Sequence, residues 1–178
     1  MIRINNKKIL LWQCAGFAAI SLGGILLHFL YDLTNKSILT APFSAVNEST
    51  WEHMKLMFFP LFVFALIQSR FFKEYSSFWC VKLFGILTGS VMIPVLFYTC
   101  GGAFGKYPDW LNIAFFFLSA AAVFFMEAQF FKKGISCGKR PCLAFLAICL
   151  IGVMFVIFTF VTPNIPLFQD PLSGTYGR

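Results

Sequence analysis

Charge is scarce in this chain of 178 residues. Only 12% of its residues are charged and seven are acidic, whereas about a quarter of a typical soluble chain is charged. Hydrophobic residues make up 59% of the sequence, which includes 25 phenylalanines. A soluble domain of this size cannot bury so much apolar surface, so the composition excludes a soluble globular protein. No segment is long and polar enough to fold separately, and residues 1–178 are predicted to form one membrane domain.

Familiar catalytic and ligand-binding motifs are also missing. The chain has no glycine-rich phosphate loop, and no Ser-His-Asp combination can be assembled from it. Its six cysteines show no paired metal-ligand spacing. A disulfide framework is not expected, because most of the cysteines would lie within apolar segments or on the reducing side of a membrane. Inverted repeats of the transporter kind are absent as well.

What the chain does contain is a series of five apolar segments. They cover residues 9–31, 54–70, 83–100, 110–131 and 142–162. One helical crossing of a bilayer needs about 20 apolar residues. Lipid offers no hydrogen bonds to the backbone, so each crossing must be a helix. The predicted fold class is therefore all-α: a polytopic bundle of five transmembrane helices, with the lipid bilayer as its surroundings.

The net charge of +7 follows the positive-inside rule and does not indicate a nucleic-acid partner. Ten basic residues flank one set of segment ends: Arg3, Lys7, Lys8, Arg70, Lys73, Lys82, Lys132, Lys133, Lys139 and Arg140. Four lie on the other side: Lys36, Lys55, Lys106 and Arg178. This bias predicts a cytoplasmic N-terminus and an extracytoplasmic C-terminus. Glu127, near the inner end of the fourth segment, is expected to be neutralised by Lys132 and Lys133.

Polar chemistry is concentrated at the outer ends of the first two segments. His28 and Asp32 are four residues apart and would share a helix face. Glu48 and Glu52 have the same spacing, with His53 directly after them. Two like charges at this spacing destabilise a helix by about 0.2–0.5 kcal/mol unless a cation or a proton is shared between them. Imidazole nitrogens and carboxylate oxygens of this kind suit zinc, iron or manganese.

These residues form the predicted site. The expected metal ligands are His28, Asp32, Glu52 and His53, and the expected catalytic residues are Glu48, Glu52 and His53. Supporting roles are expected for Asn47, Trp51, Lys55, Asp170 and Tyr176, with Asn47 as the N-cap of a helix that continues into the second segment and Lys55 as a partner of Glu52 or Trp51. The cofactor is a divalent metal; a metal-free alternative is a carboxylate held by a histidine as general acid or base.

The C-terminal tail, residues 163–178, is expected to be ordered. It contains three prolines and several apolar side chains, which a disordered tail would lack. We expect it to fold back over the outer mouth of the bundle, where Asp170 either joins the cluster or serves as a turn residue before Pro171.

Two segments carry a resemblance to a known family. Residues 43–60 read FSAVNESTWEHMKLMFFP, and residues 163–177 read PNIPLFQDPLSGTYG. Their motifs, NES-x-WEH and PLFQDP-x-SGTYG, resemble the hallmarks of a domain-of-unknown-function family of short integral membrane proteins, found mainly in Firmicutes. The resemblance covers essentially the whole chain. It implies the architecture and a multi-pass location in a bacterial cytoplasmic membrane, and it supplies no catalytic residues because the family has no established activity.

Three functions remain open on the sequence alone. The preferred one is a metal-dependent membrane hydrolase that acts on a lipid or a lipid-linked substrate. The second is a non-enzymatic binding or accessory subunit, which would dock a partner membrane protein or a second copy of the chain. The GxxxG pair Gly85 and Gly89 is expected to pack helices within the chain, and dimerisation through it is the less favoured alternative. The third, a small transporter, is disfavoured because no segment carries a charge near mid-membrane.

Overall fold

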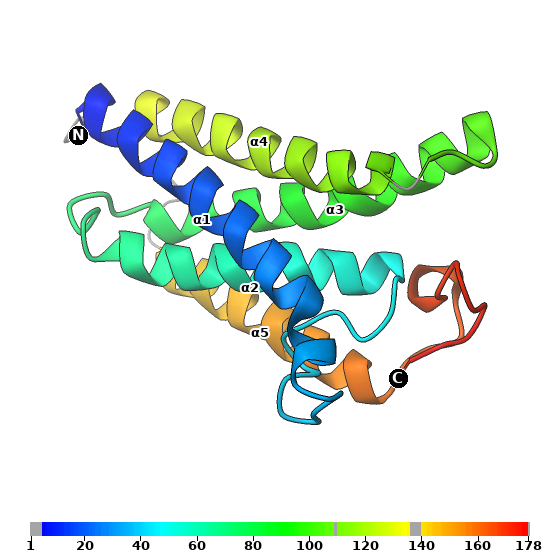
Figure 1. Cartoon of the computed structure of the whole chain (residues 1–178). Coiled ribbons are helices and arrows are strands. Elements are labelled where there is room, and N and C mark those ends of the chain that lie inside the picture. Colours follow the sequence, from blue (N-terminus) through cyan, green and yellow to red (C-terminus); the bar gives the residue numbers. More distant parts are fainter. Residues whose placement is uncertain (1–4, 109, 136–139, 178) are drawn as a thin grey trace.

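The computed structural model describes residues 5–108, 110–135 and 140–177. Five long helices follow one another along the chain (Figure 1): α1 (Asn6–Leu33), α2 (Thr50–Ser69), α3 (Phe78–Phe104), α4 (Trp110–Lys133) and α5 (Pro141–Phe160). A short 3-10 helix, η1 (Pro166–Phe168), follows in the tail. Within these described ranges there is no strand, only a single bridge between Gln169 and Tyr176. All five helices are long and apolar enough to cross a membrane, and the all-α prediction is confirmed.

The helices form one bundle in which α3 packs against both α2 and α4. Helix α1 crosses obliquely over α2 and α4, and α5 lies against α3 and α2. One end of the bundle gathers the last turn of α1, the first turn of α2, the connection between α3 and α4, and the C-terminal tail (Figure 1). We call this the tail end. The opposite end holds the beginnings of α1, α3 and α5.

Helices α2 and α3 begin earlier than hydropathy predicted. The second apolar segment begins at residue 54, whereas α2 starts at Thr50, which is still two residues later than the helix start expected from an Asn47 cap. Helix α3 starts at Phe78 rather than at residue 83. The extra turns contain charged residues, Glu52 in α2 and Lys82 in α3, and both of these side chains are buried. A hydropathy profile ends an apolar segment at a charged residue. In the folded chain both charged side chains are buried, because each is paired with an opposite charge.

Lys82 is the partner of Glu127. Its Nζ lies 2.6 Å from Glu127 Oε2, and both side chains are buried between α3 and α4. The expectation that Lys132 and Lys133 neutralise Glu127, and that Lys82 belongs to a connecting loop, is wrong. Lys132 and Lys133 were expected as partners because they are close to Glu127 in sequence, but helix packing directs the Glu127 side chain toward α3. Four phenyl rings surround the Lys82 ammonium at 5.7–6.0 Å from their centroids, from Phe64, Phe78, Phe124 and Phe131.

The start of α2 also differs from the prediction. Ser49, not Asn47, is the N-cap, and its hydroxyl accepts a hydrogen bond from the Glu52 N–H. Asn47 lies two residues earlier, where its side-chain oxygen accepts from the Ser49 N–H and its amide nitrogen donates to the Gly177 carbonyl at 2.8 Å. Glu48 therefore precedes the helix, and it does not stack on Glu52 as the spacing of four had suggested.

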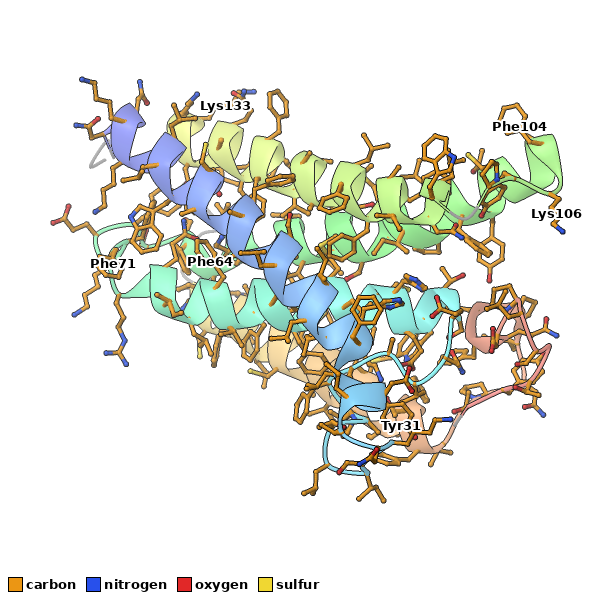
Figure 2. All side chains as sticks on the ribbon, viewed as in Figure 1. Tyr31, Phe64, Phe71, Phe104, Lys106 and Lys133 are labelled. Carbon is orange, nitrogen blue, oxygen red and sulfur yellow. The ribbon has the colours of Figure 1, made fainter. Side chains whose placement is uncertain are left out.

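Large apolar side chains cover the outside of the bundle (Figure 2). Every long helix contributes some that are about half exposed or more, including Leu11, Leu22, Val63, Val91, Leu118, Phe125, Leu143 and Leu150. Soluble monomers rarely expose contiguous apolar surface on this scale. The exterior is thus suited to contact with hydrocarbon.

Cys80 takes part in a disulfide, whereas the sequence analysis expected none. The other described cysteines, Cys14, Cys100, Cys142 and Cys149, are free thiols.

Candidate functional site

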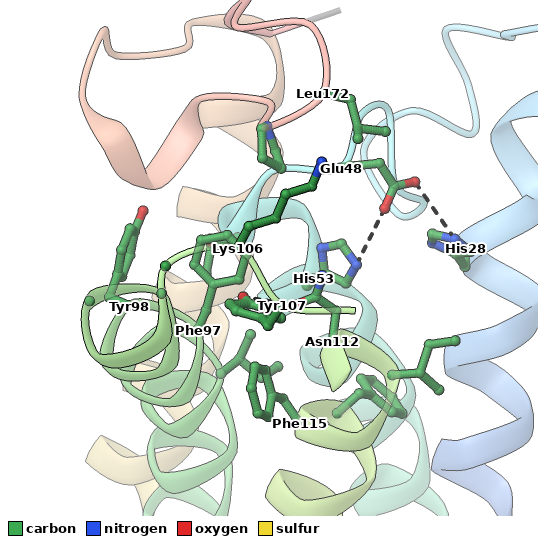
Figure 3. A pocket seen from close by; sticks show the side chains of 18 residues that line it. His28, Glu48, His53, Phe97, Tyr98, Lys106, Tyr107, Asn112, Phe115 and Leu172 are labelled. Atoms are coloured by element: carbon green, nitrogen blue, oxygen red, sulfur yellow. Dashed lines mark hydrogen bonds and ion pairs between the residues drawn. The ribbon is translucent and has the colours of Figure 1, made fainter. Parts of the chain in front are cut away.

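Three side chains from separate segments converge at the tail end of the bundle (Figure 3). His28 comes from α1, Glu48 from the connection that follows it, and His53 from the first turn of α2. Glu48 lies between the two imidazoles: its Oε1 is 3.7 Å from His28 Nε2, and its Oε2 is 3.6 Å from His53 Nε2. All three are partly buried, with side-chain exposures of 30% for His28, 41% for Glu48 and 21% for His53. The three can reach a common point.

The ring of His53 is held in one orientation by the backbone. Its Nδ1 lies 3.0 Å from the carbonyl oxygen of Ser49, one helical turn earlier. A carbonyl only accepts hydrogen bonds, so Nδ1 must carry the hydrogen. In neutral His53 this leaves the lone pair on Nε2, which faces Glu48. Histidines that bind metals are commonly oriented in this way, with the second ring nitrogen donating to a carbonyl or a carboxylate.

The spacing of the three groups fits a metal ion. Two ligands bound at about 2.0–2.1 Å to one tetrahedral ion lie roughly 3.4 Å apart. The two histidine–glutamate distances, which end on different oxygens of Glu48, are only slightly longer than this. When each residue offers one donor atom, the three atoms lie within 4.8 Å of one another. In the described part of the chain this is the one group of histidine, cysteine, aspartate or glutamate side chains close enough to share an ion.

Glu52, predicted as a ligand, lies outside this group and has a different task. Its Oε2 is 2.6 Å from Lys55 Nζ and also accepts a hydrogen bond from the Val46 N–H at 3.0 Å. Lys55 donates further bonds to the Ala41 carbonyl and to Thr159 Oγ1 in α5. Both side chains are buried. The pair therefore fastens the segment that leads to Glu48, and the predicted pairing of Lys55 with Glu52 is confirmed.

Asp32 is not brought into the cluster either. It lies at the end of α1, one turn beyond His28, and its side chain is exposed. Asp170 makes a turn of its own in the tail, where its carboxylate accepts from the Leu172 N–H and the Ser173 hydroxyl. The turn-residue alternative stated for Asp170 is the one observed.

The remaining predicted residues attach the tail to α2. The Trp51 ring packs 4.6 Å from both the Phe168 and the Phe155 ring centroids. Asn47 bonds the Gly177 carbonyl, and Tyr176 pairs with Gln169 while contacting the main core. The tail thus lies over the beginning of α2, where it completes the wall of the site.

The cluster forms part of the wall of a cavity of about 580 Å³. The opposite wall comes from the α3–α4 connection and the first turns of α4, and Pro171 and Leu172 of the tail contribute to the rim. Three residues that sequence reasoning missed lie here: Lys106, Tyr107 and Asn112. Tyr107 donates its hydroxyl hydrogen to Asn112 Oδ1 at 3.1 Å, and burial, followed by the nearby Cys100, raises the pKa of Tyr107. The one signal in the sequence was their position at the same predicted membrane face.

A second, smaller cavity of about 180 Å³ adjoins the first between α1 and α4. Its wall is almost entirely apolar, with Ile25, Phe29, Leu56 and Phe117 among the lining residues. The two cavities have lining residues in common: His28, His53, Asn112, Ile113 and Phe116. The two histidines thus stand at the junction of a polar and an apolar space.

The fold and the site together define a small all-α protein, with five helices long and apolar enough to cross a membrane and a cluster of two histidines and a glutamate at one end of the bundle. More particularly, the chain belongs to a family of unknown function, DUF6512, whose model matches residues 1–178. Comparison with curated proteins found no match, and comparison with solved structures found none either. The family assignment agrees with the resemblance stated from the sequence; the pair of hallmark motifs and the bacterial range stay predictions.

Proposed function

We propose that the protein is a metal-dependent membrane hydrolase, and that His28, Glu48 and His53 hold its metal. The proposed substrate is a lipid or a lipid-linked molecule. The observation that carries this proposal is the orientation of His53, whose Nε2 faces the Glu48 carboxylate at 3.6 Å while its Nδ1 donates to Ser49.

That arrangement calls for a cation. In neutral His53 the Nε2 lone pair and the carboxylate oxygens are all electron-rich acceptors, and they repel one another across the gap. His28 adds another imidazole on the other side of Glu48 at 3.7 Å. A divalent ion satisfies all three groups at once, whereas a single proton satisfies only one contact. Two histidines and one glutamate form a common protein ligand set of catalytic zinc, and iron and manganese accept the same donor types.

A metal held by three protein ligands leaves a position for water and lowers the pKa of that water toward neutrality. In the proposed hydrolysis the water oxygen forms a bond to the carbonyl carbon or phosphorus of an ester. The bond to the ester oxygen breaks, and the departing alcohol takes up a proton. Glu48 has two carboxylate oxygens, so one can bind the metal while the other accepts the proton of the attacking water.

We further infer that the site faces the outside of a bacterial cytoplasmic membrane. Lys82 is buried and paired, so nine of the ten basic residues assigned to the inner side still count toward the positive-inside bias. Of the four on the other side, Lys55 is likewise buried and paired. Nine against three keeps the bias in the same direction. The tail end, which carries the cluster, is then extracytoplasmic.

Metal analysis of the detergent-purified protein tests the proposal. The wild-type protein is expected to contain about one divalent metal ion per chain, and His53→Ala and Glu48→Gln are each expected to lower the content at least tenfold. Asp32→Asn is the matched control, since Asp32 is an acid close to the cluster in sequence but exposed and outside it. It should retain the wild-type content.

Two results would overturn the metal assignment. One is a wild-type protein without stoichiometric metal after purification in added zinc, iron or manganese. The other is equal metal loss in Asp32→Asn and His53→Ala. A metal-free protein that stays folded would favour the non-enzymatic accessory subunit instead.

A further inference from the structure

The apolar cavity beside the histidines has no role in metal binding. It lies between α1 and α4, and its lining includes Gly24, Ile25 and Phe29 from α1 and Phe117 from α4. Gly24 admits the ring of Phe116, which also lines the cavity, because a Cβ at this position would overlap that ring. The adjacent surfaces of both helices expose large apolar side chains, so the cavity opens among groups suited to contact with hydrocarbon.

The larger cavity has the opposite character. Among the described residues that line it, Glu48 is the one acid and Lys106 is the one lysine, and the two histidines lie beside Glu48. With a divalent ion bound, the positive charges exceed the single negative one. Figure 3 shows the Lys106 side chain extending from the α3–α4 connection along the cavity in the direction of Glu48 and Leu172. A metal and a lysine on one cavity suit a phosphate, whose oxygens can contact both.

We propose that the substrate is a lipid with a phosphate-bearing, anionic headgroup. The headgroup occupies the larger cavity between the metal centre and Lys106, and one hydrocarbon chain occupies the apolar cavity between α1 and α4. This assignment rests on the proposed function and names the substrate class of that same site. It is argued from the adjacency of the two cavities: His28, His53 and Ile113 line both, so a molecule at the metal centre lies next to each of them.

Binding of defined lipids to the purified, metal-loaded protein tests this substrate class. Native mass spectrometry would measure the affinity for dioleoyl phosphatidate, for glycerol 3-phosphate, which lacks chains, and for dioleoylglycerol, which lacks phosphate. We expect phosphatidate to bind most tightly of the three. Lys106→Gln should weaken phosphatidate about tenfold and leave dioleoylglycerol unchanged.

A pair of neighbouring substitutions tests the chain site. Ile25→Trp fills the apolar cavity and should weaken phosphatidate about tenfold, the loss expected when roughly two methylene groups lose their contacts. Leu26→Trp is the matched control: it introduces the same side chain on the same helix, at a position that is 59% exposed and does not line either cavity. It should bind phosphatidate like the wild type.

The outcomes separate this inference from the proposed function. Equal effects of Ile25→Trp and Leu26→Trp, or binding of glycerol 3-phosphate as tight as that of phosphatidate, would remove the chain site. Equal binding of dioleoylglycerol and phosphatidate would refute the proposed recognition of a phosphate group. Neither result bears on the metal content of the same samples, so the proposed metal site would remain supported. Phosphatidate binding that depends on Ile25 in a protein without metal would instead support the lipid site and refute the hydrolase.

Discussion

Individual charged residues in this chain serve two separate purposes. His28, Glu48 and His53 lie together, and among the described residues both imidazoles stay 3.6 Å or more from the carboxylate, which leaves room for an ion. Glu52 and Lys55 lie at 2.6 Å from each other and are buried, which is what a structural ion pair requires. The partly buried Glu48 carboxylate is the better candidate for chemistry, because the lone pairs of Glu52 already accept hydrogen bonds from Lys55 and Val46.

The Glu52–Lys55 pair is expected to position Glu48. Lys55→Met leaves a carboxylate buried without its counter-ion, which costs about 3–5 kcal/mol of stability. It also releases the Ala41 carbonyl and loosens the segment that carries Glu48. Thermal unfolding in detergent should show a lower midpoint, and metal affinity should fall about 10–100-fold, as for other residues that support a ligand indirectly.

Two further variants sharpen this prediction. Lys36→Met makes the same replacement at an exposed lysine of the same connection and should change neither quantity. The double variant Glu52→Gln/Lys55→Met removes both charges and should recover part of the lost stability. A Lys55→Met protein with wild-type stability and wild-type metal affinity would contradict the positioning role.

Helices in this bundle approach one another where glycines allow it. Gly85 and Gly89 both face α4 within the chain, as preferred over dimerisation from the sequence: Gly85 lies against Glu127, and Gly89 lies against Val123. A Cβ on Gly85 would be 2.4 Å from Glu127 Oε1. The glycine is therefore what admits the carboxylate between α3 and α4.

Gly85→Ala is predicted to destabilise the protein by about 1–3 kcal/mol, the usual cost of overpacking a well-filled interior. Glu127 cannot move aside freely, because its other oxygen is held by Lys82 at 2.6 Å. Gly102→Ala is the control within the same helix, as nothing lies within 4 Å of the added methyl group. It should leave the unfolding midpoint unchanged or raise it slightly, since alanine favours a helix over glycine. A Gly85→Ala midpoint equal to that of Gly102→Ala would show that the pair tolerates displacement.

The bundle as a whole keeps its two groups of ionisable side chains apart. The histidine–glutamate cluster opens to a cavity at the tail end, whereas the Lys82–Glu127 pair is enclosed toward the opposite end. Among the described residues, neither of the two cavities beside the cluster is lined by Lys82 or Glu127. This separation favours a site that acts at one end of the bundle.

Topology reporters test which face that is. Alkaline phosphatase fused after residue 178 should be active and green fluorescent protein at the same position dark, because the C-terminus is expected outside. Fusions after Gly134, which follows α4, should give the reverse pattern. A fluorescent C-terminal fusion would invert the orientation and put the candidate metal centre in the cytoplasm.

Hydropathy was enough to predict the helices, because a long apolar segment has no alternative to a helix in lipid. It also indicated that His28 and His53 belong to one end of the bundle. The capping pattern, by contrast, misplaced the start of α2 at Asn47, since Asn47 and Ser49 are both good caps and only their partners distinguish them. That shift of two residues takes Glu48 out of the helix and places it between the histidines.

Local patterns in a chain carry periodicity, composition and the identity of chemically active side chains, and these established a five-helix architecture with a polar end. Which of the acids would meet the imidazoles depended on rotations about α1 and α2 and on how α3, α4 and the tail pack around them. Lys82 and Glu127 are 45 positions apart, and Asn47 and Gly177 are 130 apart. Contacts over such separations follow from packing of the complete bundle, because no short-range rule relates residues so distant along the chain.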